Sequence, residues 1–210
     1  TAGDVTIQAE AFSRDKSTGH WAEAFLGAYG GGLGVTDSSE GDGSSSSTHT
    51  VDNTGRNNYI VFQFSKDVVI DKAYLGYVVC DSDLQAWIGS TSSPITTMSN
   101  SVLTSMGFTE VNTTTSNAAR WADLNAGSVA GNVLIIAADT TDTSPEDYFK
   151  LEKLVLQSVQ SGGVYANKAT VTVTGGLTDS DMSHYTTQVA KASIGNQIWY
   201  DKNANGIQDT

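Results

Sequence analysis

The strongest constraint on the fold of this chain is a series of short segments rich in β-branched and aromatic residues, separated by turn residues. The clearest segments are residues 59–64, 73–80, 132–138 and 148–157, and their composition is typical of β-strands. A parallel sheet needs a long crossover between consecutive strands, but the sequence offers one plausible short helix, at residues 98–106. We therefore predict an all-β fold, an antiparallel β-sandwich or jelly roll with a short C-terminal β appendage.

Weaker patterns predict further elements. Residues 5–9 alternate apolar and polar side chains, which indicates a half-buried strand at the start of the chain. The polar residues 12–20 predict a loop, whereas residues 21–26 are compatible with a strand or a helical turn. Two more strands are expected at residues 84–88 and 108–112.

Two irregularities are also predicted. The turn residues at 65–66 are expected to end the strand at 59–64. Within residues 148–157 the apolar alternation slips, and this slip predicts a β-bulge near Lys153.

The composition predicts a boundary near residue 158. Residues 1–158 are expected to form the β-sandwich domain, and the Gly-containing residues 160–163 indicate a hinge. Residues 159–192 are expected to be a linker with the terminal strands of a repeat. Residues 193–210 are expected to begin another β module.

The chain is strongly acidic, and this charge limits the classes of partner. It contains 23 Asp and Glu residues against 11 Lys and Arg residues, a formal net charge of −12. Nucleic acids and anionic membranes need a basic face, so the charge argues against both. It suits a secreted protein in salty or calcium-bearing water.

Other features favour an extracellular, bacterial cell-surface location. The sequence has a single cysteine, Cys80, so no intrachain disulfide can form; its apolar neighbours predict a buried small hydrophobe. No segment is long enough to span a membrane, so direct membrane insertion is not expected. The chain starts at Thr1 without Met, as expected of a processed secreted protein.

The C-terminus matches the start of a calcium-binding loop, D-x-[DN]-x-[DN]-G. Its oxygen donors alternate along the chain, and Gly206 permits the sharp turn that wraps them around one hard cation. The acidic residue that completes such a loop would lie beyond Thr210. An ordinary turn rich in Asn, Gly and Asp is the alternative. The candidate calcium ligands are Asp201, Asn203, Asn205, Ile207 through its carbonyl, and Asp209.

Three further places concentrate possible ligands. Asp81 and Asp83 lie two residues apart, as do Asp179 and Asp181, and either pair can share a cation or form an ordinary turn. The third place is the loop-rich stretch 30–64, which can hold a metal or polar ligand or can be a solvated loop. Its polar candidates are Asp42, His49, Asp52, Asn53 and Asn58.

No catalytic set stands out, so we expect a protein that is not an enzyme. The three histidines, His20, His49 and His184, are far apart and lie in no hydrolase or metalloprotease motif. Several glutamates could serve a glycosidase, but nothing singles out a pair. Tryptophans can stack on sugar rings or pack in the core. The candidate ligand-binding tryptophans are Trp21, Trp87 and Trp121.

The first domain resembles exported bacterial surface proteins that carry exosortase, PEP-CTERM-type, sorting. The matching pieces are residues 32–36, 50–64, 81–84 and 147–151, whose order and spacing extend over most of residues 1–158. The resemblance implies a β-sandwich surface module without catalysis.

The C-terminal part resembles two kinds of surface repeat. Residues 165–171 and 179–185 are similar to the end of an immunoglobulin-like repeat of bacterial surface proteins. Residues 193–209 resemble the opening of the calcium-binding B-type repeats of staphylococcal Sdr adhesins, the SdrD B-like (Cna B-type) repeats. This resemblance implies calcium as cofactor, bound by the ligands named above.

Together these features predict a non-enzymatic extracellular surface or matrix protein with an adhesive or structural role and calcium-stabilised modules. The expected partners are glycans or other cell-surface or matrix proteins. One alternative is a carbohydrate-binding module, because residues 5–10 are loosely similar to sugar-binding jelly rolls. Another is a filament subunit that self-associates by strand exchange, because the strands after Ser158 can complete a neighbour's sheet.

Overall fold

The computed structural model describes residues 5–41, 49–141, 145–159, 164–172 and 178–186. The chain divides into two compact units, Thr1–Val159 and Gln160–Thr210. The first unit holds a ten-stranded sheet, and the second holds a pair of strands.

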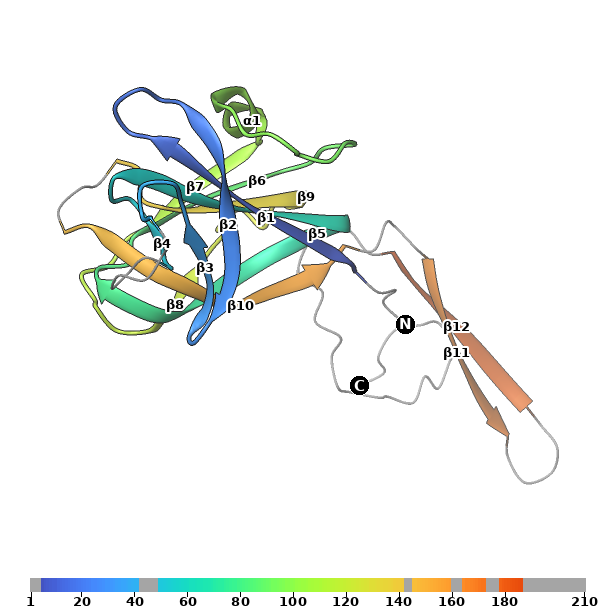
Figure 1. Ribbon diagram of the computed structural model, residues 1–210. Coiled ribbons are helices and arrows are strands. Elements are labelled where there is room, and N and C mark those ends of the chain that lie inside the picture. The colour runs from blue at the N-terminus through green and yellow to red at the C-terminus, as the bar shows by residue number, and fades with distance from the viewer. Residues whose placement is uncertain (1–4, 42–48, 142–144, 160–163, 173–177, 187–210) are drawn as a thin grey trace. The chain divides into compact units, whose positions relative to one another are not determined.

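The first unit is built almost entirely from strands (Figure 1). All-β architecture, as predicted from the sequence, is therefore confirmed. The elements are β1 Ile7–Asp15, β2 Trp21–Tyr29, β3 Gly32–Thr36, β4 Val51–Asp52, β5 Arg56–Cys80, β6 Leu84–Gly89, α1 Asn100–Ser105, β7 Phe108–Asn112, β8 Arg120–Asp123, β9 Ala130–Ala138 and β10 Asp147–Ser158.

The sheet closes on itself through one long strand. Strands β10, β3, β2, β1 and β5 are hydrogen-bonded in that order, and β5 also pairs with β10, which closes a barrel. Strands β9, β6 and β7 continue the sheet outward from β5, and β8 adds to the second half of β5. All these pairings between strands are antiparallel.

Strand β5 differs from the sequence-based prediction, which ended a strand at residues 65–66. Its first half pairs with β1 and β9, and its second half pairs with β10 and β8. The predicted turn residues form a bend between the halves, where the register to β9 shifts between Gln63 and Val68. The backbone stays extended because Ser65 accepts and donates hydrogen bonds with Thr6 across to the start of the chain.

Strands at the centre of the sheet bury both faces. In β9, Leu134 and Ile136 enter one core while Val133 and Ile135 enter the other. The first core fills the barrel, and the second lies beneath α1 and the segment that leads into it. Burial on both sides explains why residues 132–138 form an almost uninterrupted apolar run.

Several local predictions have clear outcomes. The short helix is confirmed as α1, which Ser99 caps by accepting a hydrogen bond from the Val102 amide at 3.3 Å. The bulge near Lys153 is confirmed, because the register of β10 against β5 shifts between Leu151 and Lys153. The loop predicted at residues 12–20 is wrong in its first part, because β1 continues to Asp15 and buries Phe12.

The prediction that Cys80 is buried is also wrong. Cys80 is exposed and has a φ of 64°, in the left-handed region that ends strand β5. The turn at Cys80 directs the next residue, Asp81, into the interior instead.

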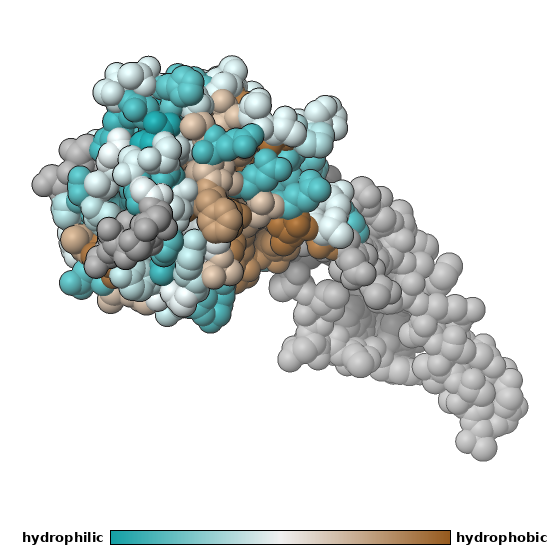
Figure 2. Space-filling view, viewed as in Figure 1, coloured by the Kyte–Doolittle hydropathy of each residue, from teal (hydrophilic) through white to brown (hydrophobic). Residues whose placement is uncertain are grey.

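The surface includes exposed apolar residues as well as polar ones. Phe25 of β2 and Ile7 of β1 are among the exposed large hydrophobic residues. Figure 2 shows hydrophobic residues gathered over β2 on the visible face, with hydrophilic residues around them.

In the second unit, β11 (Val164–Thr172) pairs with β12 (Thr178–Thr186) in an antiparallel ladder. Asp179 and Asp181, predicted to form a turn, lie within β12 opposite Val171 and Ala169. Residues 193–210, including the five predicted calcium ligands of the C-terminal loop, lie outside the described residues. Within the described part of the chain, no helix is long and apolar enough to cross a membrane.

Candidate metal centre

Three aspartates from separate segments meet at one end of the barrel. Asp81 follows β5, Asp83 precedes β6, and Asp147 begins β10. Each offers a carboxylate oxygen, and these oxygens lie within 4.8 Å of one another. All three residues are buried. The structure thus brings together the predicted pair Asp81 and Asp83 and adds a third carboxylate from a distant part of the sequence.

Backbone hydrogen bonds hold the three aspartates in place. The Asp83 amide donates to a carboxylate oxygen of Asp147 at 2.7 Å, and the Tyr148 amide donates to the Asp81 carbonyl at 3.1 Å. Asp81 also bridges Asp147 in a parallel sense, outside the regular ladder. We define the acidic triad as Asp81, Asp83 and Asp147.

Asn53 connects the acidic triad to the start of β5. Its amide nitrogen donates to a carboxylate oxygen of Asp147 at 2.9 Å and to the Asp139 carbonyl at 2.9 Å. Its side-chain oxygen accepts from the Asp147 amide at 3.1 Å. Asn53 is fully buried, so these hydrogen bonds position Asp147 in a site shielded from bulk water.

Arg120 of β8 interacts electrostatically with all three aspartates of the triad. Its guanidinium donates to Ser82 at 2.9 and 2.7 Å and to the Asn112 side chain at 2.6 Å. Burial lowers the pKa of Arg120, and the charges of Asp83, Asp81 and Asp147 oppose that change. Arg120 therefore reduces the repulsion within the triad without neutralising it.

Burial also disfavours the ionised form of Asp83. It raises the pKa of Asp83, the Thr114 amide lowers it by donating to the carboxylate, and Asp81 raises it further. Carboxylates crowded in this way are stabilised by a proton or by a hard cation with oxygen ligands. The triad has the donor chemistry of a calcium or magnesium site.

A second group of carboxylates lies in the loop-rich stretch. Burial is the main cause that raises the pKa of Asp52 to about 8, and the charges of Glu40 and Asp37 add to it. Burial likewise raises the pKa of Glu40 to about 7, with a further contribution from Asp37. At neutral pH, the Asp52 carboxyl is therefore largely protonated.

Short hydrogen bonds fix this second group. A carboxylate oxygen of Glu40 accepts from the Asp37 amide at 2.6 Å, and Asp37 in turn accepts from the Asn58 side chain at 2.7 Å. The carboxyl of Asp52 accepts from the Thr54 amide at 3.0 Å.

The alternative of a solvated loop does not hold for most of the polar candidates in this stretch. Asp52, Asn53 and Asn58 are buried, and His49 is half-buried with its ring stacked on Tyr29 at 4.1 Å between centroids. Asp42 lies outside the described residues.

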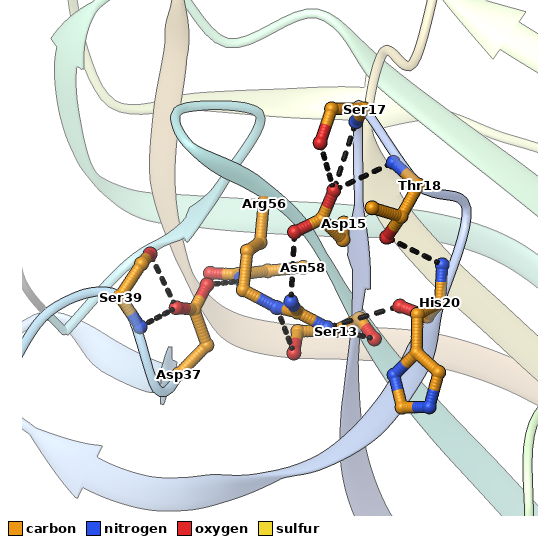
Figure 3. A network of polar contacts seen from close by, with 9 residues as sticks. All are labelled: Ser13, Asp15, Ser17, Thr18, His20, Asp37, Ser39, Arg56 and Asn58. Atoms are coloured by element: carbon orange, nitrogen blue, oxygen red, sulfur yellow. Dashed lines mark hydrogen bonds and ion pairs between the residues drawn. The ribbon is translucent and has the colours of Figure 1, made fainter.

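Figure 3 shows the polar network that holds this end of the barrel together. The Arg56 guanidinium, at the start of β5, donates to the Ser13 hydroxyl at 2.8 Å and to the His20 carbonyl at 3.1 Å. Arg56 also forms an ion pair with Asp15 at 3.4 Å. Asp15 accepts from the Ser17 hydroxyl and from the amides of Thr18 and Ser17 in the turn between β1 and β2, and these hydrogen bonds lower its pKa. These contacts thus tie the turn between β1 and β2 to the start of β5.

The three candidate tryptophans do not form one platform. Trp21 and Trp87 both contact Tyr59, with ring centroids 4.7 and 6.0 Å away; Trp87 is buried in the second core, and Trp21 packs against it. Trp121 is 45% exposed on β8. Trp121 alone of the three has a large exposed surface, so its role in ligand binding stays a prediction.

The residues that sequence reasoning missed are Asp147, Asp139 and Glu40. Asp147 carried a weak signal, because it opens a segment already named in the surface-protein resemblance. Its partners Asp81 and Asp83 are distant in sequence, so only the pairing of β10 with β5 brings them together. Comparisons of the chain with protein-family models, with curated proteins and with solved structures found no match.

Proposed function

We propose that this chain is a non-enzymatic, extracellular surface or matrix protein whose adhesive or structural role depends on calcium-stabilised modules. The observation that carries the proposal is the acidic triad, in which three buried carboxylates converge. The acidic net charge of −12 and the C-terminal calcium-loop motif support the same conclusion. The predicted sandwich or jelly roll belongs to this proposal as the scaffold of such a module.

A cation at the triad would stabilise the fold by joining three segments. It would link the end of β5 and the start of β10, which pair where the barrel closes, to the start of β6. It would also remove the repulsion among Asp81, Asp83 and Asp147. A ligand that binds only the folded state at one hundred times its Kd adds about 2.7 kcal/mol to the free energy of unfolding.

Thermal unfolding with calcium and with a chelator tests this role. We expect calcium to raise Tm by several degrees, and we expect Asp83→Asn with Asp147→Asn to remove most of that rise. Asp67→Asn, at an exposed position of β5, is the matched control and should leave it unchanged. A variant with Asp201→Asn and Asp209→Asn distinguishes a Tm rise due to calcium at the C-terminal loop from one due to calcium at the triad. A Tm that is indifferent to calcium and chelator would reject the calcium role.

A carbohydrate-binding module is the second candidate, and the exposed ring of Trp121 favours it. Flat aromatic rings on a rigid sheet can support the apolar face of a sugar. A glycan array tests this function independently of calcium, and an array without hits would exclude it.

A further inference from the structure

A row of aromatic and lysine side chains crosses the outer face of the second half of β5. Trp121 of β8, Tyr74 of β5 and Lys153 of β10 occupy directly opposed positions in neighbouring strands. The adjacent residues of β5, Ala73 and Leu75, are buried in the barrel core. Because side chains alternate along a strand, the three residues of this row lie on the opposite, outer face.

A second row lies beside the first. Tyr77 of β5 is directly opposite Lys150 of β10. The Lys150 ammonium lies 4.5 Å from the ring centroid of Tyr77 and 5.3 Å from that of Tyr29 in β2. Tyr29 belongs to the hairpin of β2 and β3, whose turn approaches Tyr77 at Gly31. The second row therefore extends from β5 across β10 to that hairpin.

The lysines of both rows lie against the rings. The Lys72 ammonium is 5.1 Å from the Trp121 ring centroid, and the Lys153 ammonium is 5.0 Å from that of Tyr74. The rings of Tyr74 and Trp121 themselves contact each other, with centroids 5.0 Å apart. Trp121 and Tyr77 remain exposed. We call this surface the aromatic–lysine band, formed by Tyr29, Lys72, Tyr74, Tyr77, Trp121, Lys150 and Lys153.

The charge of the aromatic–lysine band differs from that of the whole chain. Glu152 pairs with Lys153 at 3.2 Å, and Asp123 lies opposite Lys72. The three lysines of the band therefore outnumber these two carboxylates, whereas the whole chain has a net charge of −12. Lys150 has no acidic partner among the described ion pairs, and partial burial lowers its pKa. Relative to the rest of the protein, the band is suited to an anionic partner.

We propose that the aromatic–lysine band binds a polysaccharide that carries carboxylate groups. Exposed ring surfaces can pack against the apolar faces of sugar rings, and the lysine ammonium groups can form charge-assisted hydrogen bonds with sugar carboxylates. Two parallel rows suit a linear polymer better than a single small molecule. This inference rests on the proposed adhesive function and deepens it by naming the class of ligand.

Calorimetric titration of the full chain with hyaluronan oligosaccharides, a carboxylate-bearing glycan probe, tests the inference. We expect binding that weakens at least tenfold in the double variant Lys150→Gln and Lys153→Gln. Tyr77→Leu should weaken it at least threefold, because it removes an exposed ring at the surface. Lys66→Gln, at an exposed position of β5 outside the band, is the control for loss of a positive charge elsewhere on the sheet, and it should change Kd less than twofold.

Two further probes identify the chemistry of the partner. The same oligosaccharides with methyl-esterified carboxylates should bind at least tenfold more weakly, because the ammonium groups lose their anionic partners. Poly-glutamate of similar length should also bind at least tenfold more weakly, because it has no sugar rings. Absence of hyaluronan binding, equal binding of the esterified glycan, or equal binding of poly-glutamate would each overturn the inference.

The outcome also separates this inference from the proposed function. Titrations in chelator and in calcium, beside the Tm measurements, give independent readouts. A calcium-dependent Tm without glycan binding would overturn the polysaccharide site alone. Glycan binding with a Tm indifferent to calcium would support the site and reject the calcium role.

Discussion

The substitution Asp52→Asn should remove the pH dependence of stability that Asp52 imposes. Asp52 closes β4, is buried, and pairs through its backbone with Tyr148 of β10. Burial, with the charges of Glu40 and Asp37, raises its pKa from 3.8 to about 8. Because the folded state holds this proton more tightly than the unfolded state, its stabilisation is complete at low pH and is lost as pH rises towards about 8.

The pKa difference sets the size of the effect. Each pKa unit corresponds to about 1.4 kcal/mol, so full ionisation of Asp52 would cost the folded state about 6 kcal/mol. Asparagine is close in shape and keeps an oxygen that can accept from the Thr54 amide. At pH 9 we therefore expect Asp52→Asn to be several kcal/mol more stable than the wild-type protein, with a much smaller difference at pH 5.

Urea unfolding at pH 5, 7 and 9, in the presence of chelator, measures this effect. The wild-type free energy of unfolding should fall across the series, and the variant should keep only the smaller dependence due to Glu40. Asp67→Asn, at an exposed position, serves as control and should follow the wild-type curve. A wild-type stability that is constant from pH 5 to 9, or equal slopes for both proteins, would refute the reasoning.

Two further predictions concern packing, and unfolding in urea measures both. Leu134→Ala should lower the free energy of unfolding by about 2–5 kcal/mol, because Leu134 is fully buried in the barrel core. The control Val111→Ala, at an exposed position, should lower it by less than about 0.5 kcal/mol. Equal losses would contradict the assigned core. Gly34→Ala should cost about 1–3 kcal/mol, because its Cβ would lie 1.9 Å from the His49 carbonyl oxygen, whereas Gly30→Ala meets no atom within 4 Å. A harmless Gly34→Ala would show that β3 does not approach His49 so closely.

Local pattern determined much of the architecture. The β-branched and aromatic runs predicted an all-β chain, one short helix was placed at α1, and the slip in apolar alternation identified the bulge near Lys153. These features follow from side-chain shape and from the two-residue period of a strand, which neighbouring residues alone can show. The finer sandwich or jelly-roll topology stays a prediction.

The candidate site was only partly predictable. Asp81 and Asp83 are neighbours in the sequence and could be proposed as a pair, but Asp147 joins them through the ladder between β10 and β5. The burial of Asn53 and Asp52 was equally hidden, because polar residues in a glycine- and serine-rich stretch resemble an exposed loop.

The sequence by itself determined that the described chain would be built almost entirely from strands, and that the protein would be strongly acidic. Tertiary structure alone decided that β5 would run unbroken past its turn residues, that Cys80 would face solvent, and that Asp81 would face the interior. It also placed Trp121, Tyr74 and Lys153 in one row. The physical reason is that a strand's neighbours across the sheet, rather than along the chain, decide which of its residues lose contact with water.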